Sequence, residues 1–286
     1  MKVSVMGLGI MGAGMAGQLV AKGFDVTVWN RNPAKGVRFA KLGARVATTP
    51  ADAANGADLV ISMLAEDVAS RGVWLGGEGA LASMRAGAIA IESSTLTIDW
   101  VRELAAAAHS RGIGFLDAPV TGSKLQAESG SLAFLVGGPS DLLARARPAF
   151  EAMSGSIAHL GPVGSGATMK LINNFLCGVQ VASLAEAMAM AERSGLDVRQ
   201  AAAVLGAGSP GSPLVKMVAQ RMLDRAYEPN FFVPLMAKDL AYAREAFGRA
   251  GFELKSAEVA REAFLAAERA GFGEKDIASI VELLRR

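Results

Sequence analysis

Three polar side chains near the middle of the chain, Lys170, Asn173 and Asn174, have the types and spacing of an acid-base site. In a helix, residues three and four apart project from one face, so the ammonium group and both amides are expected to lie together. An ammonium group can protonate an oxygen that gains negative charge, and an amide can orient its neighbours through hydrogen bonds. The pattern therefore predicts that a cation and two amides converge near a domain boundary.

A glycine-rich segment at the start of the chain has the pattern of a dinucleotide-binding loop. It follows an apolar strand at Val3 to Met6, opens a helical pattern, and reads Gly7-Leu8-Gly9-Ile10-Met11-Gly12. The first glycine permits a tight turn, the second lets backbone N–H groups approach a pyrophosphate, and the third lets helix and strand pack closely. We therefore predict that all six residues bind a nicotinamide dinucleotide. The alternative is an ordinary glycine-rich turn.

The residues that follow the second predicted strand, Asp25 to Trp29, indicate whether the protein binds NAD or NADP. An NAD enzyme places an acid here to bind the ribose hydroxyls, but this chain continues with Asn30 and Arg31. A guanidinium can bind a 2'-phosphate with two hydrogen bonds, and Lys35 adds a further positive charge. NADP(H) is the predicted cofactor, bound by Asn30, Arg31 and Lys35. The alternative is an exposed arginine before a helix that starts at Pro33.

Two further groups of loop residues are candidates for ligand binding. The loops at Met63-Leu64 and at Ser93 to Thr95 follow predicted strands, and ligands of parallel sheets gather at the carboxyl ends of the strands. These loops, with Met63, Leu64 and Thr95, are therefore expected to face the cofactor, and a simple turn is the alternative for Ser94. The segment Thr121-Gly122-Ser123 offers hydroxyls and backbone N–H groups that could receive an anion, although a surface turn fits the loop chemistry equally well.

The elements that must position these residues alternate in type along the first half of the chain. Further strands are predicted at 45–47, 58–63 and 88–91, with helices at 50–55 and 97–111. Such alternation predicts a doubly wound, mostly parallel sheet of the Rossmann class over residues 1–162. An apolar run rich in alanine and methionine then predicts one long helix between Gly161 and Gly195.

Only helices are expected after that long helix, so residues 163–286 are predicted to form an all-α domain. The predicted helices cover 198–205, 214–223, 235–249, 256–270 and 274–284, and glycines separate them. The methionines of the long helix are more typical of core or subunit packing than of a cofactor site. Its outer face is expected to be buried against another subunit.

Composition excludes several classes of protein. With 286 residues, 51% of them apolar, the chain can form two packed domains, and a net charge of +2 gives little reason to expect nucleic acid. The single cysteine, Cys177, cannot form an internal disulfide, which favours a reducing compartment. Gln180 and Glu186 interrupt the longest apolar run, so we expect no membrane span and a cytoplasmic protein. No pattern of ligands predicts a metal.

Four ordered motifs together resemble the β-hydroxyacid dehydrogenases, the family of 3-hydroxyisobutyrate dehydrogenase and tartronate semialdehyde reductase, across essentially the whole chain. They are the loop at 7–12, Asp117 to Gly122, Gly164 to Asn174, and Phe231 through Lys238 and Asp239. Within the family, the segment from Thr121 to Glu128 looks most like the glyoxylate and succinic semialdehyde reductase branch. It departs from that branch at Thr121, where serine is usual, and at Leu125 and Gln126, a segment where a proline often precedes the Ala-Glu pair.

The resemblance implies roles for particular residues. Lys170 would be the catalytic residue, and the substrate carboxylate would be held by Thr121, Gly122 and Ser123 with Asn174. Asn173, on the same helix face, is also predicted to bind the substrate. Phe231 and Asp239 would line the substrate, and Lys238 the nicotinamide end. The resemblance also implies that the helical domain closes over the active site and builds a homo-dimer or homo-tetramer.

These observations predict an NADPH-dependent reductase of small aldehyde or keto acids, such as glyoxylate and succinic semialdehyde, with Lys170 as general acid. A 3-hydroxyisobutyrate or tartronate semialdehyde enzyme is the alternative within the family. A non-catalytic NADP-binding module is disfavoured because Lys170 is present, and imine reductases of the same fold usually lack this lysine. The chain is too short for a phosphogluconate dehydrogenase.

Overall fold

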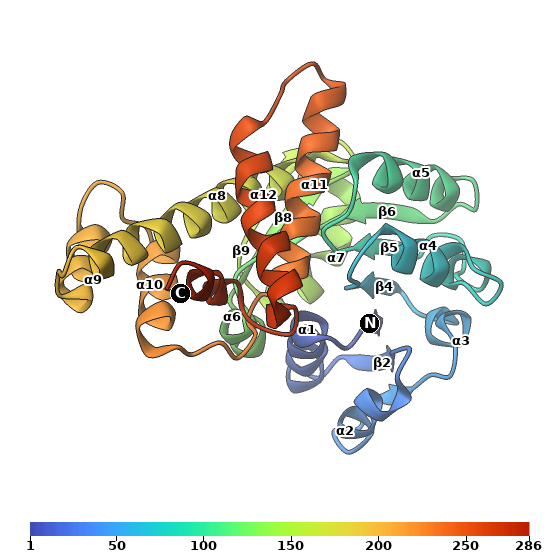
Figure 1. Ribbon diagram of the computed structural model, residues 1–286. Coiled ribbons are helices and arrows are strands. Elements are labelled where there is room, and N and C mark those ends of the chain that lie inside the picture. The colour runs from blue at the N-terminus through green and yellow to red at the C-terminus, as the bar shows by residue number, and fades with distance from the viewer. Residues whose placement is uncertain (286) are drawn as a thin grey trace. The chain divides into compact units, whose positions relative to one another are not determined.

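The structure, a computed structural model, describes residues 1–285. The chain forms two compact units, Met1–Lys170 and a second that begins at Leu171. The first unit is a mostly parallel sheet covered by helices, and the second is built almost entirely of helices (Figure 1). This architecture confirms the predicted fold class.

The sheet of the first unit has the strand order of a dinucleotide-binding fold. Six strands run parallel in the order β3-β2-β1-β4-β5-β6, and β8 continues the sheet antiparallel to β6. Because the order reverses between β1 and β4, the loops at their carboxyl ends leave a place for a ligand. The strands are β1 (Lys2–Met6), β2 (Asp25–Trp29), β3 (Arg45–Val46), β4 (Leu59–Ser62), β5 (Ile89–Glu92), β6 (Gly114–Asp117), β7 (Val120–Thr121), β8 (Leu132–Gly137) and β9 (Ser154–Gly161).

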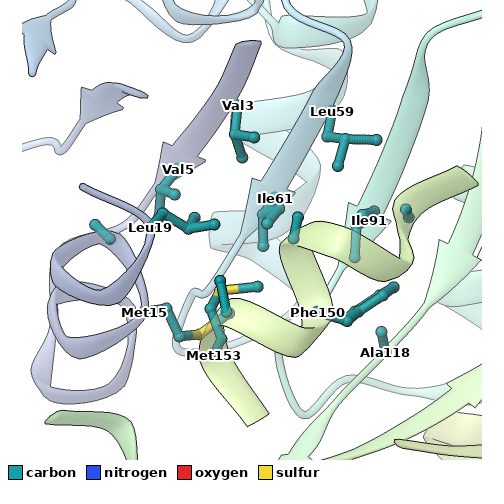
Figure 2. Close-up of a cluster of buried hydrophobic side chains, with 14 of the residues drawn as sticks. Val3, Val5, Met15, Leu19, Leu59, Ile61, Ile91, Ala118, Phe150 and Met153 are labelled. Atoms are coloured by element: carbon teal, nitrogen blue, oxygen red, sulfur yellow. The ribbon is translucent and has the colours of Figure 1, made fainter. Parts of the chain in front are cut away.

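Side chains that alternate along the central strands build two separate cores, one on each face of the sheet. On β4, Ile61 packs into the first core while its neighbour Val60 packs into the second, because successive residues point to opposite faces. Figure 2 shows Ile61 in the first core with Met15 of α1 (Ile10–Ala21) and Phe150 of α7 (Ser140–Met153). The remaining helices of this unit are α2 (Val37–Ala40), α3 (Pro50–Ala54), α4 (Asp67–Leu75), α5 (Ile98–His109) and α6 (Lys124–Ser129), with short 3₁₀ turns at Pro33–Gly36 and Ala80–Ala82.

Several elements of the first unit were not predicted, among them α4, α7 and β9. The helix α4 is short and α7 contains Pro148, so neither has a long uninterrupted helical pattern. The strand β9 pairs only with β8, and most of its residues are exposed, which removes the alternation of buried and exposed residues that marks a strand. These elements therefore lack the local signals on which the sequence reasoning depends.

The long helix predicted between the glycines is present as α8 (Ser165–Arg193). Its length and composition alone would allow it to cross a membrane, which the prediction had excluded, and 44% of its most apolar stretch is buried. Val181 and Met188 of α8 pack in the core of the second unit. One such helix is weak evidence for a membrane span, because a core helix can have the same composition.

The second unit surrounds a core that includes Met222, Met236 and Phe264. Its helices after α8 are α9 (Val198–Ala207), α10 (Pro213–Asp224), α11 (Val233–Arg249) and α12 (Lys255–Ala267), followed by a π-helical turn (Glu268–Phe272) and a 3₁₀ helix (Ile277–Leu283). The predicted helix at 256–270 corresponds to α12 and the beginning of the π-helical turn, in which Gly271 has a φ of 92°. The helix predicted at 274–284 begins at Ile277 and is a 3₁₀ helix, and the Asp276 side chain caps it by accepting the Ala278 N–H.

Candidate active site

The glycine loop between β1 and α1 has two positions that no other residue could occupy. A Cβ on Gly7 would lie 2.2 Å from the carbonyl oxygen of Met63, and one on Gly12 would lie 2.0 Å from the carbonyl oxygen of Gly7. Gly7 also has a φ of 98°. Gly9 is different, because a Cβ there would meet nothing within 4 Å. The outer side of the loop is therefore open, as a bound pyrophosphate requires.

Asn30 secures this loop from the neighbouring strand. Its Oδ1 accepts the backbone N–H of Leu8 at 2.8 Å, and its Nδ2 donates to the carbonyl of Asn32 at 2.9 Å. Gly9, the cap residue of α1, supplies no side-chain hydrogen bond to the first turn of that helix. The uncapped N–H groups and the positive end of the helix fit a phosphate. Asn30, predicted to bind the cofactor, is placed to shape the loop that does so.

Arg31 and Lys35 lie just beyond the end of β2, and both are exposed. Among residues 1–285, neither side chain forms a hydrogen bond or an ion pair. The strands β1 and β2 are paired up to Met6 and Trp29, so the glycine loop and the Arg31 segment leave the sheet side by side. The two cations are thus available for a phosphate on the adenosine end of a dinucleotide.

The other predicted cofactor residues lie at the same edge of the sheet. Met63 and Leu64 follow β4, and Thr95 follows β5. The N–H of Leu64 donates to the hydroxyl of Ser94 at 2.7 Å, which joins the two loops. Since β1, β2, β4 and β5 are neighbours in the sheet, the structure brings these predicted residues of the first unit to one edge.

The Thr121 to Ser123 loop differs from the predicted receptor in one respect. The N–H of Ser123 donates to Oε1 of Gln126 at 2.9 Å, and the Ser123 hydroxyl donates to the same oxygen at 2.6 Å. Both Ser123 donors predicted to receive an anion are therefore already bonded to Gln126. A serine followed three residues later by glutamine is the sequence pattern of a capping box, so the signal was present in the sequence.

Lys170 is half-buried in the second turn of α8, and Asp117 attaches the beginning of that helix to the sheet. Oδ1 of Asp117 accepts the N–H of Gly164 at 2.8 Å, and Oδ2 accepts the N–H of Ala167 at 2.8 Å. Burial raises the pKa of Asp117, although these backbone hydrogen bonds oppose the shift. Asp117 begins one of the four motifs of the resemblance, but its residue type and position in the sequence indicate no particular role. Its position makes it an anchor for the helix that carries Lys170.

In the second unit, the predicted amides form a connected network with two residues of α11. The Nδ2 of Asn174 donates to Oδ2 of Asp239 at 2.6 Å, and the Nδ2 of Asn173 donates to Oδ1 of Asn174 at 3.0 Å. Lys238 Nζ lies 2.9 Å from Oδ1 of Asp239 and 4.6 Å from the centre of the Tyr242 ring. Asp239 and Asn174 are each 2% exposed. Asp239 therefore fixes the orientation of the Asn174 amide.

Phe231 is held at the start of α11 by Asp276. Oδ2 of Asp276 accepts the N–H of Asn230 at 2.9 Å and that of Phe231 at 3.1 Å. The guanidinium of Arg221 lies 2.5 Å from the same carboxylate. Asp276 was not predicted as a site residue, because Asn230 and Phe231 lie 46 and 45 residues away from it along the chain.

Comparison with known proteins places this geometry in a family. Residues 2–161 match the NAD binding domain of 6-phosphogluconate dehydrogenase, and residues 164–284 match the NAD-binding domain of NADP-dependent 3-hydroxyisobutyrate dehydrogenase. An NAD-dependent L-serine dehydrogenase of Pseudomonas aeruginosa is 34% identical over 99% of this chain and 97% of its own length. The chain belongs to the β-hydroxyacid dehydrogenase family. It is an oxidoreductase that binds NAD(P) and acts on CH–OH groups.

Two further relatives show the range within this β-hydroxyacid dehydrogenase family. Glyoxylate/succinic semialdehyde reductase 1 of Arabidopsis thaliana is 32% identical over 100% of this chain and 99% of its own length. The solved structure of a Mycobacterium tuberculosis 3-hydroxyisobutyrate dehydrogenase with L-serine is 32% identical, has a TM-score of 0.89, and covers 100% of this chain and 99% of its own. These relatives support the family assignment, but their names refer to different substrates.

Proposed function

We propose that this β-hydroxyacid dehydrogenase reduces small aldehyde or keto acids with NADPH, and that glyoxylate and succinic semialdehyde are its substrates. The observation that carries the proposal is Lys170, which stands on α8 four residues before the buried amide of Asn174. Lysine is protonated at neutral pH and can supply the proton that carbonyl reduction requires.

The first unit supplies the residues for the cofactor. Bound NADPH would supply a hydride to the carbonyl carbon of the substrate. The open side of Gly9 and the uncapped N-terminus of α1 suit the pyrophosphate, and Asn30 holds that loop in place. Arg31 and Lys35 suit a 2'-phosphate, and this is the basis for proposing NADPH rather than NADH.

Lys170 donates a proton to the carbonyl oxygen as that oxygen gains negative charge. Asn174 orients the lysine and the substrate, and its own amide is held by Asp239. The Thr121 to Ser123 loop receives the substrate carboxylate. Because Oε1 of Gln126 already accepts both Ser123 donors, a carboxylate must displace this oxygen to use them.

The substrate is proposed from the loop sequence. Ser123-Lys124 and Ala127-Glu128 follow the pattern of the glyoxylate and succinic semialdehyde reductase branch. A second candidate is oxidation of L-serine or 3-hydroxyisobutyrate, because relatives with those names match the chain equally well. Thr121 carries one methyl group more than the serine that is usual at this position in the family, so the substrate pocket is expected to be smaller.

The test is the rate of NADPH consumption with glyoxylate, succinic semialdehyde, tartronate semialdehyde and methylmalonate semialdehyde, each repeated with NADH. The reverse reaction is measured with L-serine and 3-hydroxyisobutyrate. We expect the highest kcat/KM with NADPH and glyoxylate or succinic semialdehyde. A higher kcat/KM with L-serine or 3-hydroxyisobutyrate would favour the second candidate, and no turnover despite tight NADPH binding would favour a non-catalytic protein.

We also infer a cytoplasmic homo-oligomer that assembles through the second unit. Leu176 and Met190 of α8 are 55% and 69% exposed, and Val204 of α9 is 66% exposed. A second copy of the chain would remove these apolar side chains from water. Light scattering after size-exclusion chromatography is expected to give a dimer or a tetramer, and a monomeric mass would contradict the inference.

A further inference from the structure

A buried carboxylate without a cationic partner lies at the carboxyl end of β5. Glu92 is 0% exposed, and within residues 1–285 it forms no ion pair. Its oxygens accept hydrogen bonds from three neutral donors: the Ser70 hydroxyl at 2.6 Å, the Trp74 indole at 2.9 Å and the Ser94 N–H at 2.9 Å. An apolar side chain could fill this space without the cost of burying a charge, so the carboxylate indicates a task beyond packing.

One side of Glu92 is fixed by the helices that cover the sheet. Ser70 and Trp74 belong to α4, and Ser70 in turn accepts the indole N–H of Trp100 on α5 at 2.9 Å. The Trp74 indole also lies 3.1 Å from the hydroxyl of Ser62, the last residue of β4. These rigid donors leave the Glu92 carboxylate a single orientation.

The other side of Glu92 holds the two loops that follow β4 and β5. Oε1 of Glu92 accepts the N–H of Ser94, and the Ser94 hydroxyl accepts the N–H of Leu64 at 2.7 Å. The residues next to these contacts, Met63 and Thr95, are the ones proposed to face the cofactor. The carbonyl oxygen of Met63 lies so close to Gly7 of the glycine loop that a Cβ on Gly7 would be only 2.2 Å from it. A single chain of hydrogen bonds thus runs from the buried carboxylate to the edge where the nucleotide would bind.

We propose that Glu92 is a positioning residue for the nicotinamide nucleotide: through Ser94 it holds the Leu64 loop in its binding arrangement before the nucleotide arrives. The inference rests on the proposed function, because it needs the loops to face the cofactor. A loop that is already ordered loses less conformational freedom on binding, so the nucleotide binds more tightly. Glu92 itself does not touch the nucleotide.

Two matched serine variants test this role. Ser94→Ala removes the acceptor of the Leu64 N–H, while Ser70→Ala removes a hydroxyl from the same network and leaves the Leu64 contact in place. We expect Ser94→Ala to raise the Kd for NADPH about tenfold, the effect of one lost hydrogen bond. Ser70→Ala is expected to lower the melting temperature and to leave the Kd within about twofold. Fluorescence titration and circular dichroism provide these measurements.

Hydrogen exchange supplies a further readout, and its deciding measurement is made on the wild-type protein. In the wild-type protein without nucleotide, the Leu64 amide is expected to be as protected as the amides of β4, and Glu92→Gln is expected to speed its exchange. Rapid exchange of Leu64 in the wild type would overturn the proposal, as would equal Kd values for both serine variants. A wild-type protein that binds neither NADPH nor NADH would refute the proposed function instead, so the two failures are distinguishable.

Discussion

At the scale of single residues, Lys170 is the group on which the proposed chemistry depends. Removal of a general acid typically lowers a rate by about 10² to 10⁴, so Lys170→Ala is expected to reduce kcat by that factor while the Kd for NADPH stays the same. Lys255→Ala is a suitable control, because the Lys255 side chain is 82% exposed and is distant from Lys170 in the sequence. A loss of less than tenfold in kcat would exclude Lys170 as the general acid.

Arg31 is the residue on which the proposed cofactor preference depends. Arg31→Ala removes charged hydrogen bonds to a 2'-phosphate, so we expect the Kd for NADPH to rise by roughly 10- to 100-fold while the Kd for NADH changes little. The exposed Lys41, changed to alanine, controls for the general loss of one positive charge. If the ratio of the two Kd values is the same in Arg31→Ala as in the wild type, another residue selects the cofactor.

At the scale of elements, the attachment of α8 to the sheet connects structure with catalysis. Asp117→Asn places an amide N–H against one of the two backbone N–H groups that the carboxylate now accepts. We expect the free energy of unfolding to fall by about 1 to 3 kcal/mol and kcat to fall with it, because Lys170 follows the anchored turn. The Kd for NADPH should change little. An unchanged kcat in a destabilised variant would show that the anchor serves the fold alone.

The link between β3 and α3 predicts a dependence of stability on pH. The Arg45 guanidinium, 2.7 Å from Asp52, and the N–H of Thr48 hold the pKa of Asp52 below its ordinary value of 3.8. A lowered pKa in the folded state gives stability that is present above the unfolded pKa and is lost as pH falls through the folded pKa. The wild type should therefore be more stable than Asp52→Asn at pH 7. Urea unfolding should show this difference shrinking below about pH 4.

At the scale of the whole molecule, two units with separate cores are expected to respond differently to the nucleotide. All the proposed cofactor residues except Lys238 belong to the first unit. A ligand at 100 times its Kd stabilises the unit that binds it by about 2.7 kcal/mol. Hydrogen exchange with and without NADPH should therefore slow most in β1 and β4. Equal slowing across α9 to α12 would contradict this expectation.

The division of the chain into units lies within α8 itself. The first turns of this helix, with Ala167 in a core of the first unit, belong to the sheet, and Val181 and Met188 belong to the helical core. A single apolar run predicts such a helix well, because a period of 3.6 residues is a local signal. The same run does not reveal which core each turn joins, because that depends on packing partners elsewhere in the chain.

The sequence by itself determined the elements and residues whose signals are local. The glycine loop, the alternation of strands and helices, α8 and the Lys170 to Asn174 spacing all depend on neighbours within about ten residues. Only the tertiary structure decided what the buried carboxylates do. Glu92 bonds Ser70, Asp117 bonds Gly164 and Asp276 bonds Phe231 across 22, 47 and 45 residues, respectively. Contacts at such separations arise only when the strands and helices pack, so no local sequence pattern predicts them.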